Sequence, residues 1–141
     1  MRHFSSWKDM KVGDTVTFSR TFTEGDVANF TGVTGDFNPI HMDPGTARSC
    51  GFTDRVVPGL LTGSMLTHAG GTLLPEPYPA SKMFFRFLAP VYIGETIQAR
   101  VEVTEKNPEK NKLTLHITCT NQSGKAVLEG EVSGKITPVS E

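Results

Sequence analysis

A carboxylate and an imidazole lie five residues apart in one polar segment, Thr34-Gly-Asp-Phe-Asn-Pro-Ile-His41. Pro39 fixes its own φ and favours an extended conformation for Asn38. A rigid turn of this kind can aim Asp36 and His41 at one point, where the pair would hold a water molecule and exchange protons with it. The same string is also typical of a simple turn in which Asp36 or Asn38 caps backbone amides. From these residues alone, both interpretations stay open.

A second candidate for chemistry is the amide that follows Pro58 at the start of a predicted helix. Because Pro58 has no N–H, Gly59 carries the first available donor, at a helix end that favours developing negative charge. Without the upstream motif, the dipeptide is more typical of an ordinary helix start. Ser64 lies further along the same helix and is expected to pack there. Its functional interpretation is that the hydroxyl orients Asp36 from the helix.

Other patterns in the chain do not indicate a cofactor, a metal or a nucleophile. The glycine spacing around Ser64 is not that of a G-x-S-x-G nucleophile elbow, and neither G-x-G-x-x-G nor G-x-x-x-x-G-K occurs. Cys50 and Cys119 lie far apart, outside any C-x-x-C arrangement. The remaining histidines do not lie at metal-ligand spacing in the sequence and are expected to be structural or surface residues: His3, His68 and His116. We therefore expect no metal site, no cofactor and no disulfide.

Length and charge indicate one domain without a strong electric field. The 141 residues correspond to a single domain, assigned to 1–141. Fourteen basic and fifteen acidic side chains give a net charge of -1, so nucleic acid and anionic membrane surfaces are not expected partners. The first residues lack a signal-peptide core, and no stretch approaches the ~20 apolar residues that span a bilayer. The expected location is the cytoplasm or the mitochondrial matrix.

The first half of the chain predicts one strand and two helices. Alternation over Thr15–Phe22 predicts an edge strand. Thr23 followed by Asp26 predicts a capped helix over 24–34, in which Val27, Phe30 and Val33 recur at helical spacing. The polar stretch from Gly35 to Pro58 shows no periodicity and is expected to be a long functional loop. A buried helix is predicted over Leu60–Leu74, from the spacing of Leu61, Met65, Ala69 and Leu73.

The second half predicts strands joined by short turns. They are expected over Lys82–Leu88, Thr96–Glu105, Lys112–Thr120 and Lys125–Ile136. The third shows the clearest alternation, with one apolar face (Leu113, Leu115, Ile117, Cys119) and one wetter face (Thr114, His116, Thr118, Thr120). The predicted fold class is α+β, an antiparallel sheet wrapped around a central buried helix. A sheet with open edges and an apolar face is also expected to form a homodimer.

These segments together resemble a known family. The matching strings lie between about Phe22 and Pro138: Thr34-Gly-Asp-Phe-Asn-Pro-Ile-His41, Pro58-Gly-Leu-Leu61 and Phe87-Leu-Ala-Pro-Val-Tyr-Ile-Gly-Glu95. They resemble the MaoC-like (R)-specific enoyl-CoA hydratases and related 3-hydroxyacyl-thioester dehydratases. The resemblance implies the hot-dog fold, a site at a dimer interface, and no metal or redox cofactor.

The resemblance also implies roles for individual residues. Asp36 and His41 would hold the catalytic water, and Gly59 would donate to the thioester oxygen. Ser64 would support Asp36, with Asn38 as a further supporting residue in the motif. The substrates would be acyl-CoA or acyl-carrier-protein thioesters of fatty-acid metabolism. A hydro-lyase of this kind interconverts the trans-2-enoyl and (R)-3-hydroxyacyl forms.

One departure from the family pattern leaves two alternative functions open. Pro58 stands where these hydratases often have His, so the geometry of the oxyanion donor is less well defined than the Asp36–His41 pair. A hot-dog thioesterase would release a free thiol. A non-catalytic acyl-thioester-binding subunit would bind ligand without turnover. Because one fold serves all three functions, the site must decide between them.

Overall fold

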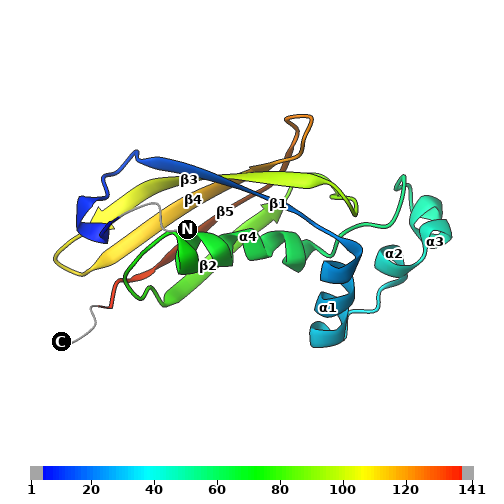
Figure 1. Cartoon of the computed structure of the whole chain (residues 1–141), viewed down its shortest axis with the longest axis horizontal. Coiled ribbons are helices and arrows are strands. Elements are labelled where there is room, and N and C mark those ends of the chain that lie inside the picture. The colour runs from blue at the N-terminus through cyan, green and yellow to red at the C-terminus, as the bar shows by residue number, and fades with distance from the viewer. Residues whose placement is uncertain (1–4, 138–141) are drawn as a thin grey trace.

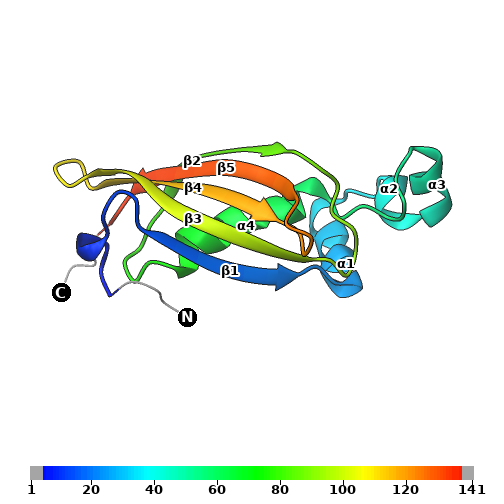
Figure 2. The same ribbon diagram turned by 90° about the horizontal axis from the view of Figure 1, so that it is seen from above.

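Five antiparallel strands form one sheet in the computed structural model, which describes residues 5–137. The order across the sheet is β1-β3-β4-β5-β2, so β1 and β2 are its edges (Figure 2). Helix α4 lies against one face, and α1, α2 and α3 lie beyond one end (Figure 1). The elements in chain order are a 3-10 helix (Trp7–Asp9), β1 (Thr15–Thr21), α1 (Glu24–Thr34), α2 (Pro39–Met42), α3 (Pro44–Ser49), α4 (Gly59–Thr72), β2 (Ala80–Phe87), β3 (Thr96–Asn107), β4 (Lys112–Thr120) and β5 (Ala126–Lys135).

Alternating apolar side chains of the central strands form the core. The buried face predicted for β4 is confirmed, since its four members are all buried: Leu113, Leu115, Ile117 and Cys119. β3 contributes residues of the same period: Ile97, Ala99, Val101 and Val103. Fully burying one large apolar side chain stabilises a fold by about 1.5–3 kcal/mol, so this shared face supplies much of the stability.

Helix α4 packs closely on the sheet because it carries small residues where rings approach it. Met65, Leu66 and Ala69 are buried in the core. At Gly63, an added Cβ would lie 3.2 Å from the ring of Phe85 in β2. The prediction of a buried helix is confirmed, with bounds that differ by one or two residues from those expected. The antiparallel sheet around a central helix is likewise as predicted.

The link from β1 into α1 is fixed by reciprocal hydrogen bonds, as the sequence predicted. The N–H of Asp26 donates to Oγ1 of Thr23 at 3.2 Å, and the N–H of Thr23 donates to Oδ2 of Asp26 at 2.9 Å. Gly35 ends the helix with a φ of 74°, in the left-handed region that favours glycine. The direction in which the chain leaves α1 toward Asp36 is therefore set at both ends of the helix.

Two expectations for this region were wrong. The 35–58 segment was expected to lack regular structure, but it contains α2 and α3, which have four and six residues. Helices this short cannot show a 3.6-residue period. The expected apolar stripe of α1 also fails at Val33, which is 86% exposed, while Val27 and Thr31 are buried. Because α1 lies beyond the end of the sheet, only one narrow side of it is covered (Figure 1).

Candidate active site

The structure brings Asp36 and His41 together. Oδ2 of Asp36 lies 3.5 Å from Nε2 of His41. The side chain of His41 is 7% exposed and that of Asp36 is 42% exposed. A nearly buried imidazole therefore faces a carboxylate that still contacts solvent.

A backbone carbonyl fixes the tautomer of His41. Its Nδ1 lies 2.7 Å from the carbonyl oxygen of Val56. Since a carbonyl only accepts, Nδ1 carries the hydrogen, and Nε2 of the neutral ring presents a lone pair on the side of Asp36. Two acceptors cannot bond to each other, but both can accept from one water molecule or share one proton. This is an arrangement that can withdraw a proton from water.

The turn that presents Asp36 is built by its own side chains. Oδ1 of Asp36 accepts from the N–H of Asn38 at 3.2 Å, and Oδ1 of Asn38 accepts from the N–H of Ile40 at 3.3 Å. Asn38 is thereby the N-cap of α2, and Pro39 is its first residue. The two interpretations of this string are compatible, because Asp36 uses one oxygen for the turn and presents the other to His41.

The segment that follows α3 connects α2 to the sheet. The N–H of Val56 donates to the carbonyl of Ile40 at 3.0 Å, and the N–H of Val57 donates to the carbonyl of Val91 at 2.7 Å. The Tyr92 hydroxyl accepts from the N–H of Thr53 at 3.3 Å. These bonds hold the carbonyl that binds His41 at a fixed place relative to the start of β3.

Gly59 begins α4, and a ring of β2 packs directly on it. The N–H groups of Leu61 and Thr62 donate to the carbonyl of Pro58, so the amide of Gly59 precedes the hydrogen bonds of the helix itself. An added Cβ on Gly59 would lie 2.6 Å from Cζ of Phe87. Any larger residue at this position would therefore have to displace the Phe87 ring.

A cavity of about 390 Å³ connects these groups. Its wall includes His41 and Gly59, and most of the remainder is apolar: Ile40, Phe52, Val56, Val57, Thr62, Phe87, Leu88, Ala89, Pro90, Val91 and Val127. Asp36 does not line the cavity itself, but it lies next to His41, which does. The volume falls within the ~300–1,000 Å³ typical of small-molecule sites. A mostly apolar cavity with an imidazole and a helix-start amide suits an acyl chain that ends in a polar group.

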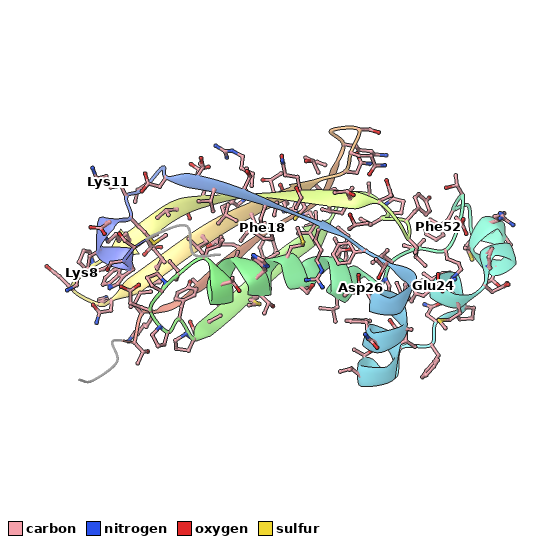
Figure 3. All side chains as sticks on the ribbon, viewed as in Figure 1. Lys8, Lys11, Phe18, Glu24, Asp26 and Phe52 are labelled. Carbon is pink, nitrogen blue, oxygen red and sulfur yellow. The ribbon has the colours of Figure 1, made fainter. Side chains whose placement is uncertain are left out.

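The remaining candidates have structural surroundings. The hydroxyl of Ser64 donates to the carbonyl of Leu61 at 2.6 Å and makes no hydrogen bond to Asp36 within residues 5–137. The ring of His68 stacks on Phe18 of β1, with centroids 4.0 Å apart. Phe18 is labelled in Figure 3. His116 is half-buried in β4, and His3 lies outside the described residues.

Metal-ligand groups and membrane spans are not found in the part of the chain that the structure describes. There, no three His, Cys, Asp or Glu side chains gather around a common point. Nor does that part contain a helix with the length and apolar character to cross a bilayer. Cys119 is buried in the core and Cys50 is exposed at the end of α3.

Three residues around the pair were not singled out from the sequence. Val56 acts through its backbone carbonyl, which leaves no signal in residue type. Phe87 was interpreted only as part of a strand and of the resemblance. Arg55 donates from Nε to the carbonyl of His41 at 2.8 Å. The only sequence feature that could have indicated Arg55 is the place of a basic residue directly before the apolar run of Val56, Val57 and Pro58.

Comparisons with known proteins identify the family of this chain. A family model described as a MaoC like domain matches residues 8–124. An (R)-specific enoyl-CoA hydratase of Rhodospirillum rubrum is 36% identical over 90% of this chain and 88% of its own length. A mitochondrial 3-hydroxyacyl-[acyl-carrier-protein] dehydratase of Solanum lycopersicum is 33% identical over 90% of this chain and 78% of its own length.

A solved structure extends the agreement to the whole fold. The (R)-hydratase from A. caviae involved in PHA biosynthesis superposes with a TM-score of 0.85 and 30% identity. The superposition covers 92% of this chain and 99% of that one. The expected hot-dog architecture is thereby confirmed. With a family match over most of its length and a relative above 30% identity, the chain belongs to the MaoC-like domain family.

Proposed function

We propose that this chain is a hydro-lyase that adds water to trans-2-enoyl thioesters and removes it from (R)-3-hydroxyacyl thioesters in fatty-acid metabolism. One observation carries the proposal: Asp36 and His41 face each other at 3.5 Å beside a mostly apolar cavity that has His41 and Gly59 in its wall. The relatives are named for both directions of this reaction, as a hydratase and as a dehydratase.

In the hydration direction, Asp36 and His41 hold one water molecule that lies beside the pair and donates to Oδ2 or Nε2. The water oxygen forms a bond to C3 of the substrate while one water proton passes to the pair. The π electrons of the C2–C3 bond move toward the thioester carbonyl, and C2 of the resulting enolate takes a proton from the pair. Dehydration follows the same steps in reverse. The two groups titrate as a coupled unit, so the proton belongs to the pair and not to one residue.

Gly59 stabilises the charge that develops on the thioester oxygen. Its N–H is at the first position of α4, where unpaired amides give the helix end a partial positive charge. A donor aimed at a developing oxyanion stabilises the transition state more than the ground state. Pro58 in place of the histidine common in the family does not remove this donor.

The shared water predicts the stereochemistry. The water held by the pair supplies the hydroxyl, and the pair itself supplies the proton. Both therefore reach the double bond from the same face, which is syn addition. The (R) configuration follows from the names of the Rhodospirillum rubrum and A. caviae relatives.

The proposal includes CoA and acyl-carrier-protein thioesters, because both present the acyl group on the same phosphopantetheine arm. The relatives differ in carrier, since one is named for enoyl-CoA and one for an acyl-carrier-protein substrate. The mitochondrial name of the tomato relative supports the mitochondrial matrix as one of the two compartments we propose, with the cytoplasm as the other. Comparing kcat/KM for crotonyl-CoA and crotonyl-acyl-carrier protein identifies the preferred carrier.

The direct test is hydration of crotonyl-CoA by the purified protein. We expect loss of the conjugated-thioester absorbance in proportion to enzyme, and (R)-3-hydroxybutyrate on chiral chromatography after hydrolysis. In deuterated water, the label at C2 should lie on the same face as the hydroxyl. An (S) product or anti addition would contradict the shared-water mechanism.

A thiol reagent in the same assay distinguishes hydration from hydrolysis. Stoichiometric release of free CoA would indicate a thioesterase, and binding without turnover would indicate a non-catalytic subunit. Burial raises the pKa of the Cys119 thiol to about 12, so this cysteine gives no background at neutral pH. Exposed Cys50 is corrected for with an enzyme blank.

We further propose that the active form is a homodimer joined along β2. This edge strand carries exposed apolar side chains, with Met83 43%, Phe84 49% and Phe87 54% exposed. The opposite edge, β1, is mainly polar. Phe87 also forms part of the cavity wall, so a second copy along β2 would cover the cavity from that side.

A further inference from the structure

The largely buried side chain of Arg55 connects Glu24 of α1 to the backbone of His41 in α2. Its side chain is 18% exposed. Nε donates to the carbonyl oxygen of His41 at 2.8 Å, and one terminal nitrogen pairs with Oε1 of Glu24 at 2.8 Å. Glu24 is the first residue of α1, on which it is labelled in Figure 3. Nε and one of the two terminal nitrogens of the guanidinium are therefore bonded within the protein itself.

Arg55 and Val56 together make three hydrogen bonds to two consecutive residues of α2. The Arg55 side chain donates to the carbonyl of His41, and the N–H of Val56 donates to the carbonyl of Ile40. The carbonyl of Val56 accepts from Nδ1 of His41. A helix of four residues satisfies few of its own carbonyls, so α2 depends on these outside partners.

We propose that Arg55 is a positioning residue for the hydration reaction: it holds the backbone of His41 so that Nε2 stays at the distance from Asp36 that one water requires. The inference rests on the proposed function and adds a residue to it. A guanidinium suits this task because its donors point in fixed directions toward two acceptors, whereas a lysine ammonium is a single point charge. Displacing a catalytic group by about 1 Å can cost on the order of 10²-fold in rate.

Arg55→Met tests the proposal, since it keeps most of the stem and removes both polar contacts. We expect kcat for crotonyl-CoA hydration to fall on the order of 10²-fold while KM changes little, because the acyl cavity is unchanged. Glu24→Gln keeps the bond to His41 and should have a smaller effect. Arg20→Met is the matched control: Arg20 also pairs with the start of α1, through Asp26 at 3.9 Å, and should leave kcat unchanged.

A second measurement separates positioning from general stability. If Arg55 acts through His41, adding Arg55→Met to His41→Ala should not lower kcat further, although it lowers the melting temperature. A multiplicative further loss would overturn the proposal. So would wild-type kcat in Arg55→Met, or a change confined to KM, which would indicate direct contact with the phosphates of CoA.

Further variants separate a failure of folding, and a failure of the proposed function, from a failure of the role of Arg55. If Arg55→Met does not fold, Arg55→Lys retains the charge and the stem, and a reduced kcat with an unchanged KM is again the expected result. If Asp36→Asn and His41→Ala both retain near wild-type activity, the proposed function fails. If those variants are inactive and the Arg55 variants behave like wild type, only the role of Arg55 fails.

Discussion

Each side chain of the Asp36–His41 pair uses one polar atom to hold its own position and leaves the other for chemistry. Asp36 accepts from the N–H of Asn38 with Oδ1, and His41 donates to the carbonyl of Val56 with Nδ1. Oδ2 and Nε2 then face each other. Because the positioning partners are backbone groups, a change to either reacting side chain should affect chemistry more than folding.

Asp36→Asn and His41→Ala are each expected to lower kcat for crotonyl-CoA hydration by about 10²–10⁴-fold, the usual loss for a general acid–base group. Since both act on one water, the double variant should be little worse than the poorer single variant. Steady-state kinetics measures both effects, and circular dichroism checks that the fold is kept. Multiplicative losses would instead assign separate roles to the two residues.

Gly59→Ala is expected to reduce kcat/KM while leaving the fold intact. The new methyl would lie 2.6 Å from Cζ of Phe87, a half-exposed ring that can move aside. Moving the ring and the amide by about 1 Å would cost on the order of 10²-fold. Combining Gly59→Ala with Phe87→Leu should recover part of the activity. If the combination recovers nothing, contact with Phe87 is not the cause.

At the scale of elements, the three helices beyond the sheet depend on side-chain caps. Thr23, Asn38 and Asp43 each accept from a backbone N–H in the first turn of α1, α2 and α3. The hydroxyl and the N–H of Thr46 lower the pKa of Asp43, because both bonds favour its ionised form. Such short helices are unstable alone, so caps and tertiary contacts determine whether the pair is presented.

Removing the cap of α1 should destabilise the protein measurably. Thr23→Ala deletes the acceptor for the N–H of Asp26 and should lower the free energy of unfolding by about 1 kcal/mol. Urea denaturation measures this change. Ser49→Ala is the control, because that hydroxyl only donates to the carbonyl of Thr46 at the end of α3. An equal loss in both variants would contradict a specific capping effect.

The other half of this cap should show a pH dependence. The N–H of Thr23 lowers the pKa of Asp26, so folding favours the ionised carboxylate. This contribution is fully present above the ordinary pKa of the carboxyl group and is lost as pH falls through the lowered value. The stability difference between wild type and Asp26→Ala should therefore shrink in acid, which urea titrations at several pH values would show. A constant difference would mean that the carboxylate charge is not involved.

The elements with a clear period were predictable, and those that depend on distant contacts were not. The alternation of β4 and the four-residue spacing of α4 reflect burial on one side, which residue type records directly. In contrast, β1 pairs with β3 across more than seventy residues, and α2 is held by bonds from residues 55 and 56. Asp36 and His41 are close in sequence, so the sequence alone could predict that they form a pair. Their supports come from backbone atoms and from Arg55, so only the structure identifies them.

At the scale of the whole molecule, the cavity lies where parts of the chain that are far apart in sequence meet. Its wall combines α2 and the 52–57 segment, the start of α4, and the residues around the end of β2 with the start of β5. Figure 2 shows that β2 lies at the edge of the sheet, with no strand of the described chain on its outer side. The site is thus next to the edge strand that carries the exposed apolar side chains Met83, Phe84 and Phe87.

The exposed edge strand β2 should determine the oligomeric state. Phe84→Lys places a charge on the outer strand, a substitution that blocks strand pairing in natural sheets. We expect light scattering to show a dimer for the wild type and a shift toward monomer for the variant. Ser19→Lys on the edge strand β1 is the matched control and should remain dimeric.

Activity should follow assembly, because Phe87 of the same strand contributes to the cavity wall. The Phe84 variant should therefore lose crotonyl-CoA hydration at concentrations where it is monomeric, and regain part of it as concentration rises and the dimer reforms. Ser19→Lys should show no such dependence. A monodisperse wild-type monomer with full activity would rule out both the dimer and its contribution to the site.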